Sequence, residues 1–452
     1  MNDLFSKEGP VISATAPGRM DVMGGIADYS GSLLLQMPIK QTTTVNLQER
    51  KDGVYHLRTA LTKKKHADFI IDSSELNNKS LEEAGTIIKS KKNGDWAVYV
   101  LGCFLVLQKE RSVDLTGANV FIESNVPLGK GVSSSAALEV ATMNALIRIY
   151  NVSLEREELA VAAQMAENLV AGAPCGLMDQ LSSHLGQKNK LLPLVCQPHT
   201  VLKPISIPRG IHFSGIDSGV RHAVSGASYG DVRAAAFMCY TIIARHEGVS
   251  VEELYQARKT GVWNSLPYKG FLANITVPDF ENKYASLIPS EISGNDFLDN
   301  YVVSIDAVTR IDRQKIYKPL VCGSHPVHEN ARVHEFKSLL KNFKKQDDKE
   351  PSLIMMGQLM MQSHESYSAV GLGNESTDNI VAMVRNAGPE NGVYGARVSG
   401  GGNGGTVCIL SYDKKGKDAV RSIYKEYKKM MKKRLFFFSG SSHGAYTLNQ
   451  YI

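Results

Sequence analysis

The segment from residue 166 to residue 186 holds two acidic side chains on either side of a sharp bend. Glu167 stands late in an amphipathic helical pattern, and Asp179 follows a Pro-Cys-Gly run that breaks the helix. Two carboxylates separated by a turn can divide two tasks, the binding of Mg²⁺ and the orientation of a hydroxyl group. Either acid could equally cap a helix or pair with a cation, so this segment alone leaves both interpretations open.

A loop rich in glycine and serine, VPLGKGVSSSAA at residues 126–137, comes directly before a predicted helix. Free backbone N–H groups and the positive end of the helix dipole would face the same point there, which favours a phosphate group. The loop is not a Walker A motif, because Lys130 is followed by Gly131 and not by serine or threonine. A tight turn with an ordinary serine cap is the alternative.

A third loop, RVSGGGNGG at residues 397–405, contains a formal GxGxxG pattern at Gly400, Gly402 and Gly405. A dinucleotide-binding fold requires a helix directly after such glycines, whereas the following TVCILSY is typical of a strand. The pattern therefore argues against a nicotinamide cofactor. Glycines at this density still indicate positive φ angles or a close approach of the backbone to a neighbour.

Helices and strands must position these loops. Leu138, Ala141, Ala145 and Ile149 recur at helical spacing after Ser133 or Ser134 as N-cap, and a second helix is predicted at about 155–171. Runs of β-branched or apolar residues bounded by turn formers predict strands at 11–17, 33–39, 42–48, 119–124, 211–217, 395–400 and 406–412. The elements lack the regular rhythm of a βα barrel, so we expect an α+β protein with mixed sheets.

The length of 452 residues, with 43% hydrophobic and 21% charged residues, favours two domains. The stretch 196–210 contains three prolines and no helical period, which makes it the best candidate for a boundary. We therefore expect one domain at 1–205 and another at 206–452.

Charge and cysteine content exclude several classes of protein. The net charge of +6 is spread over surface-type runs such as 62–66 and 424–434, so we expect no nucleic-acid partner. The six cysteines lack CxxC spacing, which is typical of reduced thiols in a cytoplasmic protein. The N-terminus has no secretory pattern, and the longest apolar run, 96–107, is shorter than the roughly 20 residues that span a bilayer. The sequence does not indicate an oligomeric state.

Taken together, these loops resemble the motifs of the GHMP kinases, which include galactokinase, homoserine kinase, mevalonate kinase and phosphomevalonate kinase. APGRMDVMGGIADYSG at 16–31 resembles the galactokinase signature loop, PLGKGVSSSAALEVA at 127–141 the second motif, and RVSGGGNGG the third. PCGLMDQ at 174–180 resembles the segment that bears the catalytic base. DSGVRHAVSGASYGDVRAA at 217–235 resembles a galactokinase stretch that runs from an arginine to a sugar-contacting tyrosine.

This resemblance implies a fold and a set of functional residues. The N-terminal domain would resemble the second domain of ribosomal protein S5, the C-terminal domain would be ferredoxin-like, and the active site would lie in the cleft between them. Asp179 would accept or orient the proton of an anomeric hydroxyl group, with Arg19 and Arg221 nearby. Ser135 and Glu167 would coordinate Mg²⁺. The sugar would contact Asp28, Gly25, Ile26, Tyr229 and Gly176, and ATP would bind at Gly129, Lys130, Gly131, Val132, Ser133, Ser134, Ser135 and Ala136.

One departure from the galactokinase pattern suggests the substrate. Galactokinases have Glu and then His where this chain has Gly25 and Ile26, and in those enzymes both residues attend to the C6 end of the sugar. L-Arabinopyranose matches D-galactose at carbons 2, 3 and 4 and lacks carbon 6. The loops also look like the kinase region of plant L-arabinokinases. We therefore expect a kinase that phosphorylates L-arabinose at O1, and we expect Glu and His at positions 25 and 26 to favour galactose.

Two other interpretations stay open. The chain could be a galactokinase with relaxed contacts, or a kinase of another galactose-like sugar. It could also be a non-catalytic sugar and nucleotide sensor, although the intact SSSAA run and Asp179 argue against this. Plant L-arabinokinases carry an additional N-terminal glycosyltransferase-like region for which this sequence has no room, so we expect a stand-alone kinase.

Overall fold

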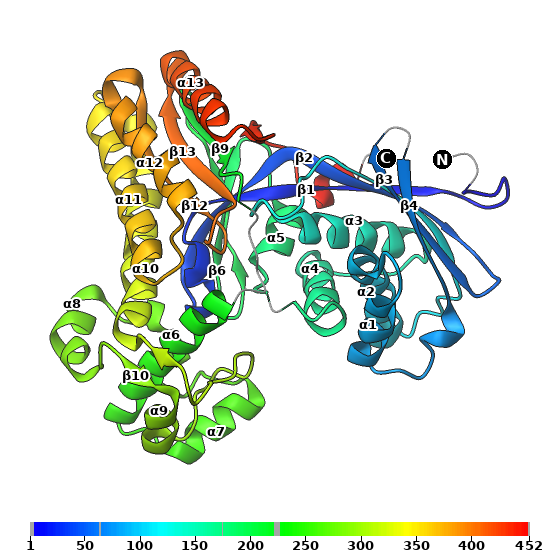
Figure 1. The fold of residues 1–452 in the computed structure, drawn as a ribbon, viewed down its shortest axis with the longest axis horizontal. Helices are drawn as coiled ribbons and strands as arrows, with labels where there is room; N and C mark the ends of the chain where they lie inside the picture. The colour runs from blue at the N-terminus through cyan, green and yellow to red at the C-terminus, as the bar shows by residue number, and fades with distance from the viewer. Residues whose placement is uncertain (1–3, 63–64, 174, 221–226, 451–452) are drawn as a thin grey trace. The chain divides into compact units, whose positions relative to one another are not determined.

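The computed structural model describes residues 4–62, 65–173, 175–220 and 227–450 (Figure 1). The chain forms two compact units that alternate along the sequence. Unit 1 consists of Met1–Met20, Met37–Leu191 and Gly440–Ile452, and unit 2 consists of Asp21–Gln36 and Leu192–Ser439. The segment Asp21–Gln36 therefore packs with unit 2. It holds most of the loop at residues 16–31 that resembles the galactokinase signature. The division at residues 205 and 206 stays a prediction.

Unit 1 is a mixed sheet with helices on one side. Strand β3 runs parallel to β5, and β2 pairs antiparallel to β5 through Thr43–Glu49. Helices α1, α2, α3 and α4 all lie on the same side of strands β1 to β4 (Figure 1). The elements are β1 (Ile12–Met23), β2 (Leu33–Glu49), β3 (Val54–Thr62), β4 (Lys65–Asp72), α1 (Leu81–Ser90), α2 (Gly94–Arg111), β5 (Ala118–Ser124), α3 (Ser134–Ile149), α4 (Arg156–Met165), the π-helical turn η3 (Ala166–Val170), α5 (Met178–Leu185), the start of β6 (Lys190–Val195) and α14 (Ala445–Leu448).

The core of unit 1 joins this sheet to its helices. Val45 and Leu57 of the sheet, Phe104 of α2 and Val140 of α3 are buried in one continuous hydrophobic cluster. Helix α3 is buried almost continuously from Ala136 to Leu146, so its N-terminus is held rigidly relative to the sheet. The glycine-rich loop that precedes α3 therefore ends at a fixed point.

Unit 2 contains an antiparallel sheet with strand order β12-β13-β9-β14. Helices α10, α11 and α12 run beside one another next to this sheet (Figure 1). The elements are the 3₁₀ helix η1 (Gly25–Ser30), β7 (Thr200–Val201), β8 (Ile205–Ser206), β9 (Ile211–Asp217), α6 (Ala227–His246), α7 (Val251–Thr260), α8 (Val277–Asp279), β10 (Ile292–Ser293), α9 (Gly294–Tyr301), β11 (Ile316–Tyr317), α10 (Pro319–Asn342), α11 (Glu350–Ala369), α12 (Glu375–Ala387), β12 (Val393–Ser399), β13 (Thr406–Tyr412), α13 (Asp413–Met431) and β14 (Phe437–Ser439).

The structure confirms the α+β class with mixed sheets and most of the predicted elements. The two strands expected at 33–39 and 42–48 are one continuous strand, β2, because no turn former separates them. Helix α3 begins as predicted, with Ser133 at the N-cap position. The second predicted helix is α4 followed by the π-helical turn η3, and it is capped by Glu155 and Glu158.

Two expectations from composition also have structural counterparts. The cysteine residues are all free thiols. Within the described ranges, no helix combines the length and the apolar character needed to cross a membrane.

Candidate active site

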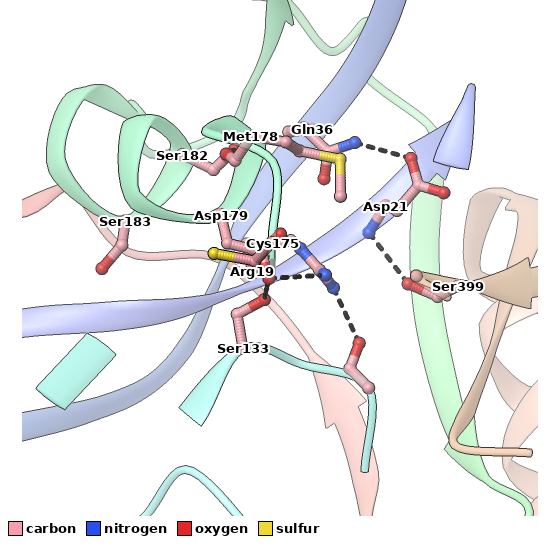
Figure 2. Close-up of polar contacts among 12 residues, drawn as sticks. Arg19, Asp21, Gln36, Ser133, Cys175, Met178, Asp179, Ser182, Ser183 and Ser399 are labelled. Atoms are coloured by element: carbon pink, nitrogen blue, oxygen red, sulfur yellow. Dashed lines mark hydrogen bonds and ion pairs between the residues drawn. The ribbon is translucent and has the colours of Figure 1, made fainter. Parts of the chain in front are cut away.

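Asp179 lies in the first turn of α5, directly after the bend that the sequence indicated. Arg19 at the middle of β1 donates two hydrogen bonds to its carboxylate, from Nε to Oδ1 at 2.8 Å and from Nη2 to Oδ2 at 3.1 Å (Figure 2). The arginine side chain is 5% exposed and that of Asp179 is 22% exposed. An accessible carboxylate held by a buried cation stays in one orientation and can accept a proton from a hydroxyl group.

Arg19 also connects Asp179 to the glycine-rich loop within unit 1. Its Nη1 donates to the carbonyl oxygen of Gly131 at 2.7 Å, and its backbone N–H donates to Val132 at 3.1 Å. The preceding Gly18 allows this contact, because a Cβ atom there would lie 2.5 Å from the carbonyl oxygen of Val132. The signature sequence Gly-Arg thus brings a strand and the loop into direct contact.

The loop itself turns through three residues with positive φ angles. Gly129 and Gly131 both have φ of 67°, and Ser133 has φ of 57°. Ser133 occupies the N-cap position of α3, but its hydroxyl group donates to Oδ2 of Asp179 at 2.5 Å (Figure 2). Among the residues that the structure describes, no side chain forms a capping hydrogen bond at the start of α3. Its first N–H groups can therefore serve a phosphate.

Two further carboxylates of unit 1, those of Glu167 and Glu139, share a hydrogen-bond donor. Glu167 stands in the π-helical turn η3, where the nearby side chain of Ser135 acts to lower its pKa. Gln180 donates to Glu167 at 2.7 Å and to the fully buried Glu139 at 3.0 Å. Burial, together with the charge of Asp179, raises the pKa of Glu167 to about 7. Unit 1 thus brings Ser135, Asp179 and Glu139 near Glu167. The metal-binding role of Ser135 and Glu167 stays a prediction.

Glu139 was not among the residues that we predicted. Burial raises the pKa of Glu139 well above its usual value, and the charge of Glu167 raises it further. The sequence does hold a signal for this residue, an acid inside the otherwise apolar helix that follows the glycine-rich loop.

In unit 2, the loop that contains Asp28 folds into the buried 3₁₀ helix η1. The backbone closes this turn through hydrogen bonds from Ala27 to Gly24 at 3.1 Å and from Gly31 to Asp28 at 3.0 Å. The Oδ1 atom of Asp28 also accepts the N–H of Tyr29 at 2.8 Å. The loop is thus a preformed structure with its acid fixed in place.

Tyr29 brings this loop next to the predicted sugar contact Tyr229. The two rings meet edge to face with centroids 6.1 Å apart. In the described part of the chain, the buried hydroxyl group of Tyr29 has no hydrogen-bond partner. Two of the predicted sugar contacts of unit 2, Asp28 and Tyr229, therefore both adjoin Tyr29.

Ile26 and Gly25 do not present polar groups. Ile26 is 2% exposed and belongs to the hydrophobic core of unit 2 together with Val398 and Tyr367. Gly25 has φ of 47°, a backbone conformation that favours glycine. The two residues that depart from the galactokinase pattern are thus part of the packing of unit 2.

A buried polar cluster, made of Asp21, Arg397, Ser363, Glu329 and Gln36, supports this loop and escaped sequence analysis. Arg397 donates to Asp21 at 2.5 Å and to Ser363 at 2.9 Å. Gln36 donates to the other oxygen of Asp21 at 2.6 Å, as Figure 2 shows. Asp21 and Arg397 are fully buried, so their charges are paired as burial requires.

The third glycine-rich loop closes a β-hairpin between β12 and β13, whose last pair is Ser399 with Thr406. Gly400, Gly402, Gly404 and Gly405 all have positive φ angles. This geometry agrees with the expectation that no dinucleotide-binding helix follows the glycines.

Gly176 and Arg221 are two further residues of the predicted site. Gly176 lies in the bend before α5, in unit 1. Arg221 lies outside the described residues.

Two family models and several known proteins are similar to this chain. The family model described as "GHMP kinases N terminal domain" matches residues 98–187, and "GHMP kinases C terminal" matches residues 339–433. An L-arabinokinase from Arabidopsis thaliana is 36% identical over 98% of this chain, which spans about half, 47%, of the length of that relative. A galactokinase from Chloroflexus aggregans is 28% identical over 92% of this chain and 88% of its own length.

Solved structures share the fold. A Lactococcus lactis galactokinase complexed with galactose superimposes with a TM-score of 0.72 at 19% identity, covering 98% of this chain and 96% of its own. The Methanococcus jannaschii mevalonate kinase gives a TM-score of 0.57 at 16% identity, covering 97% and 100%. Because the sequence identities are low, these two similarities show a shared fold and nothing about substrates.

Proposed function

Since this chain belongs to the GHMP kinase family, we propose that it transfers a phosphoryl group from ATP to the anomeric hydroxyl group of L-arabinose. The observation that carries this proposal is the pair of Arg19 and Asp179, in which two parallel hydrogen bonds hold a partly exposed carboxylate. The same arginine contacts the loop that begins α3. A kinase needs a positioned proton acceptor and a phosphate-binding helix start, and unit 1 carries both.

In this proposal Asp179 accepts the proton of the sugar O1 as that oxygen attacks the γ-phosphorus of ATP. The bond between O1 and phosphorus forms, the bond between phosphorus and the β,γ-bridging oxygen breaks, and ADP leaves. Arg19 holds the carboxylate in one orientation and offsets negative charge on the transferring group, a role that Arg221 would share. Such reactions depend mainly on positioning and on charge stabilisation.

The ATP phosphates bind the backbone of Gly129–Ala136 in this mechanism. The positive φ angles of Gly129 and Gly131 and the uncapped start of α3 support this assignment. Lys130 adds positive charge on the same loop. The glycine-rich turn thus supplies donors that are already oriented before ATP arrives.

Ser135 and Glu167 fit a Mg²⁺ ion bound together with ATP. Glu167 is a buried carboxylate whose pKa is raised to about 7 by desolvation and by the charge of Asp179, a local excess of negative charge that a divalent cation would relieve. Mg²⁺ is typically held by one or two protein groups plus substrate phosphates. Mg²⁺ would neutralise the charge of those phosphates. The side chain of Ser135 lies near enough to Glu167 to lower its pKa, so both groups could reach the same ion.

Sugar recognition is assigned to Asp28 and Tyr229 of unit 2 and to Gly176. We propose L-arabinose and not D-galactose as the substrate for two reasons. Gly25 and Ile26 supply no polar side chain, and the Arabidopsis thaliana relative is named L-arabinokinase. The second candidate is galactokinase activity, which the Chloroflexus aggregans relative favours.

The test is ATP-dependent phosphorylation of L-arabinose, D-galactose, D-fucose and D-galacturonate, with kcat/KM compared and the phosphate located by NMR. We expect a preference for L-arabinose with the phosphate on O1. A preference for D-galactose would replace the proposal by its alternative. Nucleotide binding without turnover of any of these sugars would overturn both and support a sensor.

A further inference from the structure

Tyr367 of α11 links two of the glycine-rich loops of unit 2. Its hydroxyl oxygen accepts the backbone N–H of Ile26 at 2.8 Å and donates to the carbonyl oxygen of Gly400 at 2.9 Å. The first loop carries Asp28, and the second closes the hairpin between β12 and β13. A single buried hydroxyl group therefore fixes the backbone of both loops.

The same hydroxyl group occupies the space beside Gly25. A Cβ atom built on Gly25 would lie 1.6 Å from Oη and 2.7 Å from Cζ of Tyr367, and 2.8 Å from Nη2 of Arg397. Contacts this short do not occur between non-bonded atoms, so any side chain at position 25 must displace the tyrosine. The absence of a side chain at Gly25 is thus a requirement of its neighbour.

Tyr367 has little freedom to move. It is fully buried. The guanidinium group of Arg397 lies over its ring at 5.2 Å, and the ring of His325 meets it edge to face at 5.4 Å. Arg397 is in turn held by Asp21 and Ser363. Displacement of the tyrosine would disrupt a packed cluster that includes a buried ion pair.

The residue before Gly25 is held by the same polar cluster. Glu329 accepts the backbone N–H of Gly24 at 3.2 Å and the hydroxyl group of Ser363 at 2.6 Å. The loop thus has backbone contacts with side chains of α10 and α11 on both sides of Gly25. These contacts set the path of the chain that leads into Asp28.

We infer that Tyr367 is a specificity-determining residue of this site. It fills the position at which an acidic side chain would project from residue 25, and so it restricts the site to galactose-configured sugars that need no polar contact there, such as an aldopentopyranose. This inference rests on the proposed function. It also narrows our expectation for the loop: on this inference, Glu and His at positions 25 and 26 favour galactose only where Tyr367 is replaced as well.

The first experiment tests the steric coupling. Gly25→Ala is made in the wild-type background and in Tyr367→Leu, which removes both Oη and Cζ. Gly261→Ala is the matched control, because Gly261 has φ of 68° and a Cβ there would meet nothing within 4 Å. We expect Gly25→Ala to lower kcat/KM for L-arabinose by about tenfold or more, as overpacking does, and Gly261→Ala to change it little. The loss should be several-fold smaller in Tyr367→Leu, and an equal loss in both backgrounds would overturn the inference.

The second experiment tests specificity. Gly25→Glu with Ile26→His is made in the wild-type and Tyr367→Leu backgrounds, and the ratio of kcat/KM for D-galactose to that for L-arabinose is measured. We expect the ratio to rise by about tenfold only where Tyr367 is replaced, because the introduced acid then has room to reach a hydroxyl group. A rise in the wild-type background, or no difference between the two, would overturn the inference.

These outcomes are separable from failure of the proposed function. If the wild-type protein phosphorylates neither sugar, the proposed function fails, and the melting temperatures of the Gly25→Ala and Tyr367→Leu single and double variants still measure the coupling. Additive effects would then overturn the steric part, and a smaller effect of Gly25→Ala in Tyr367→Leu would support it. Should Tyr367→Leu fail to fold, Tyr367→Phe takes its place, with partial relief expected because Cζ remains.

Discussion

Ser133 occupies the N-cap position of α3, yet its hydroxyl group binds Oδ2 of Asp179 and not the helix. A serine at this position usually satisfies one of the first N–H groups of its helix. Here the carboxylate gains a third donor, after the two from Arg19, and the helix start keeps its own donors for a ligand. The side chain that would cap the helix thus orients the Asp179 carboxylate instead.

The first prediction concerns Asp179. Asp179→Asn keeps the shape of the side chain but removes its capacity to accept a proton, so we expect kcat to fall by roughly 10²- to 10⁴-fold. Sugar and nucleotide binding, measured by calorimetry, should persist. Asp68→Asn in an exposed ion pair is the control and should leave kcat unchanged. A near-normal kcat in Asp179→Asn would remove this residue from the mechanism.

Arg19→Lys tests the orientation of that carboxylate. Lysine keeps the charge but cannot form two parallel hydrogen bonds, so we expect kcat to fall about tenfold or more, with a smaller change in KM for ATP. Arg58→Lys is the matched control, because Arg58 makes the same two-bond contact with Asp68 at an exposed position. If both lysine variants behave alike in steady-state kinetics, the orientation has no role in turnover.

Glu167→Gln tests the assigned magnesium ligand. The amide keeps the size of the side chain and loses the charge, so we expect the Mg²⁺ concentration for half-maximal rate to rise by about tenfold or more. Glu158→Gln on the preceding helix α4 serves as control, since Glu158 is an exposed capping residue. Titration of the rate with MgCl₂ at saturating ATP gives the answer, and an unchanged Mg²⁺ requirement would assign the metal elsewhere.

Glu329 predicts how stability depends on pH. Burial alone would raise the pKa of Glu329, but the guanidinium groups of Arg332 and Arg397 outweigh it and hold the pKa at about 2. Because this value lies below the usual 4.5, the carboxylate stabilises the fold above about pH 4.5. That contribution is lost as the pH falls from there through about 2.

Glu329→Gln should therefore lower the free energy of unfolding by about 3 to 5 kcal/mol at pH 7, as expected for a broken buried ion pair. The difference from wild type should shrink when urea unfolding is repeated near pH 3. Glu365→Gln is the control, because Glu365 pairs with Arg385 at an exposed position and should cost less than about 1 kcal/mol. A difference that stays constant with pH would contradict the assigned cause.

Local patterns predicted much of unit 1. Glycines, serines and helical periodicity near Ser134 indicated a glycine-rich turn followed by the start of α3, and the structure has both. That the turn binds phosphate stays a prediction. The bend before Asp179 was likewise read from proline and glycine. These features depend on residues close together in the sequence, and the physics of turns and helix starts acts at that range.

The contact between Tyr367 and the loop of Gly25 could not be predicted in this way. Tyr367 is separated from Ile26 by 341 residues. The only local signals were a glycine with no evident turn role and Arg397, a charge inside a strand that reads as buried. Neither identifies its partner, because steric exclusion between distant elements leaves no periodic trace in the sequence.

The alternation of the two units constrains how such proteins can be recombined. The chain passes between the units after Met20, Gln36, Leu191 and Ser439. A single crossover with a relative would therefore split at least one unit between two parents. A crossover placed between Gly25 and Tyr367 would also separate the loop of Gly25 from the helix that carries Tyr367. Chimaeras that exchange sugar preference need paired crossovers that carry both segments together.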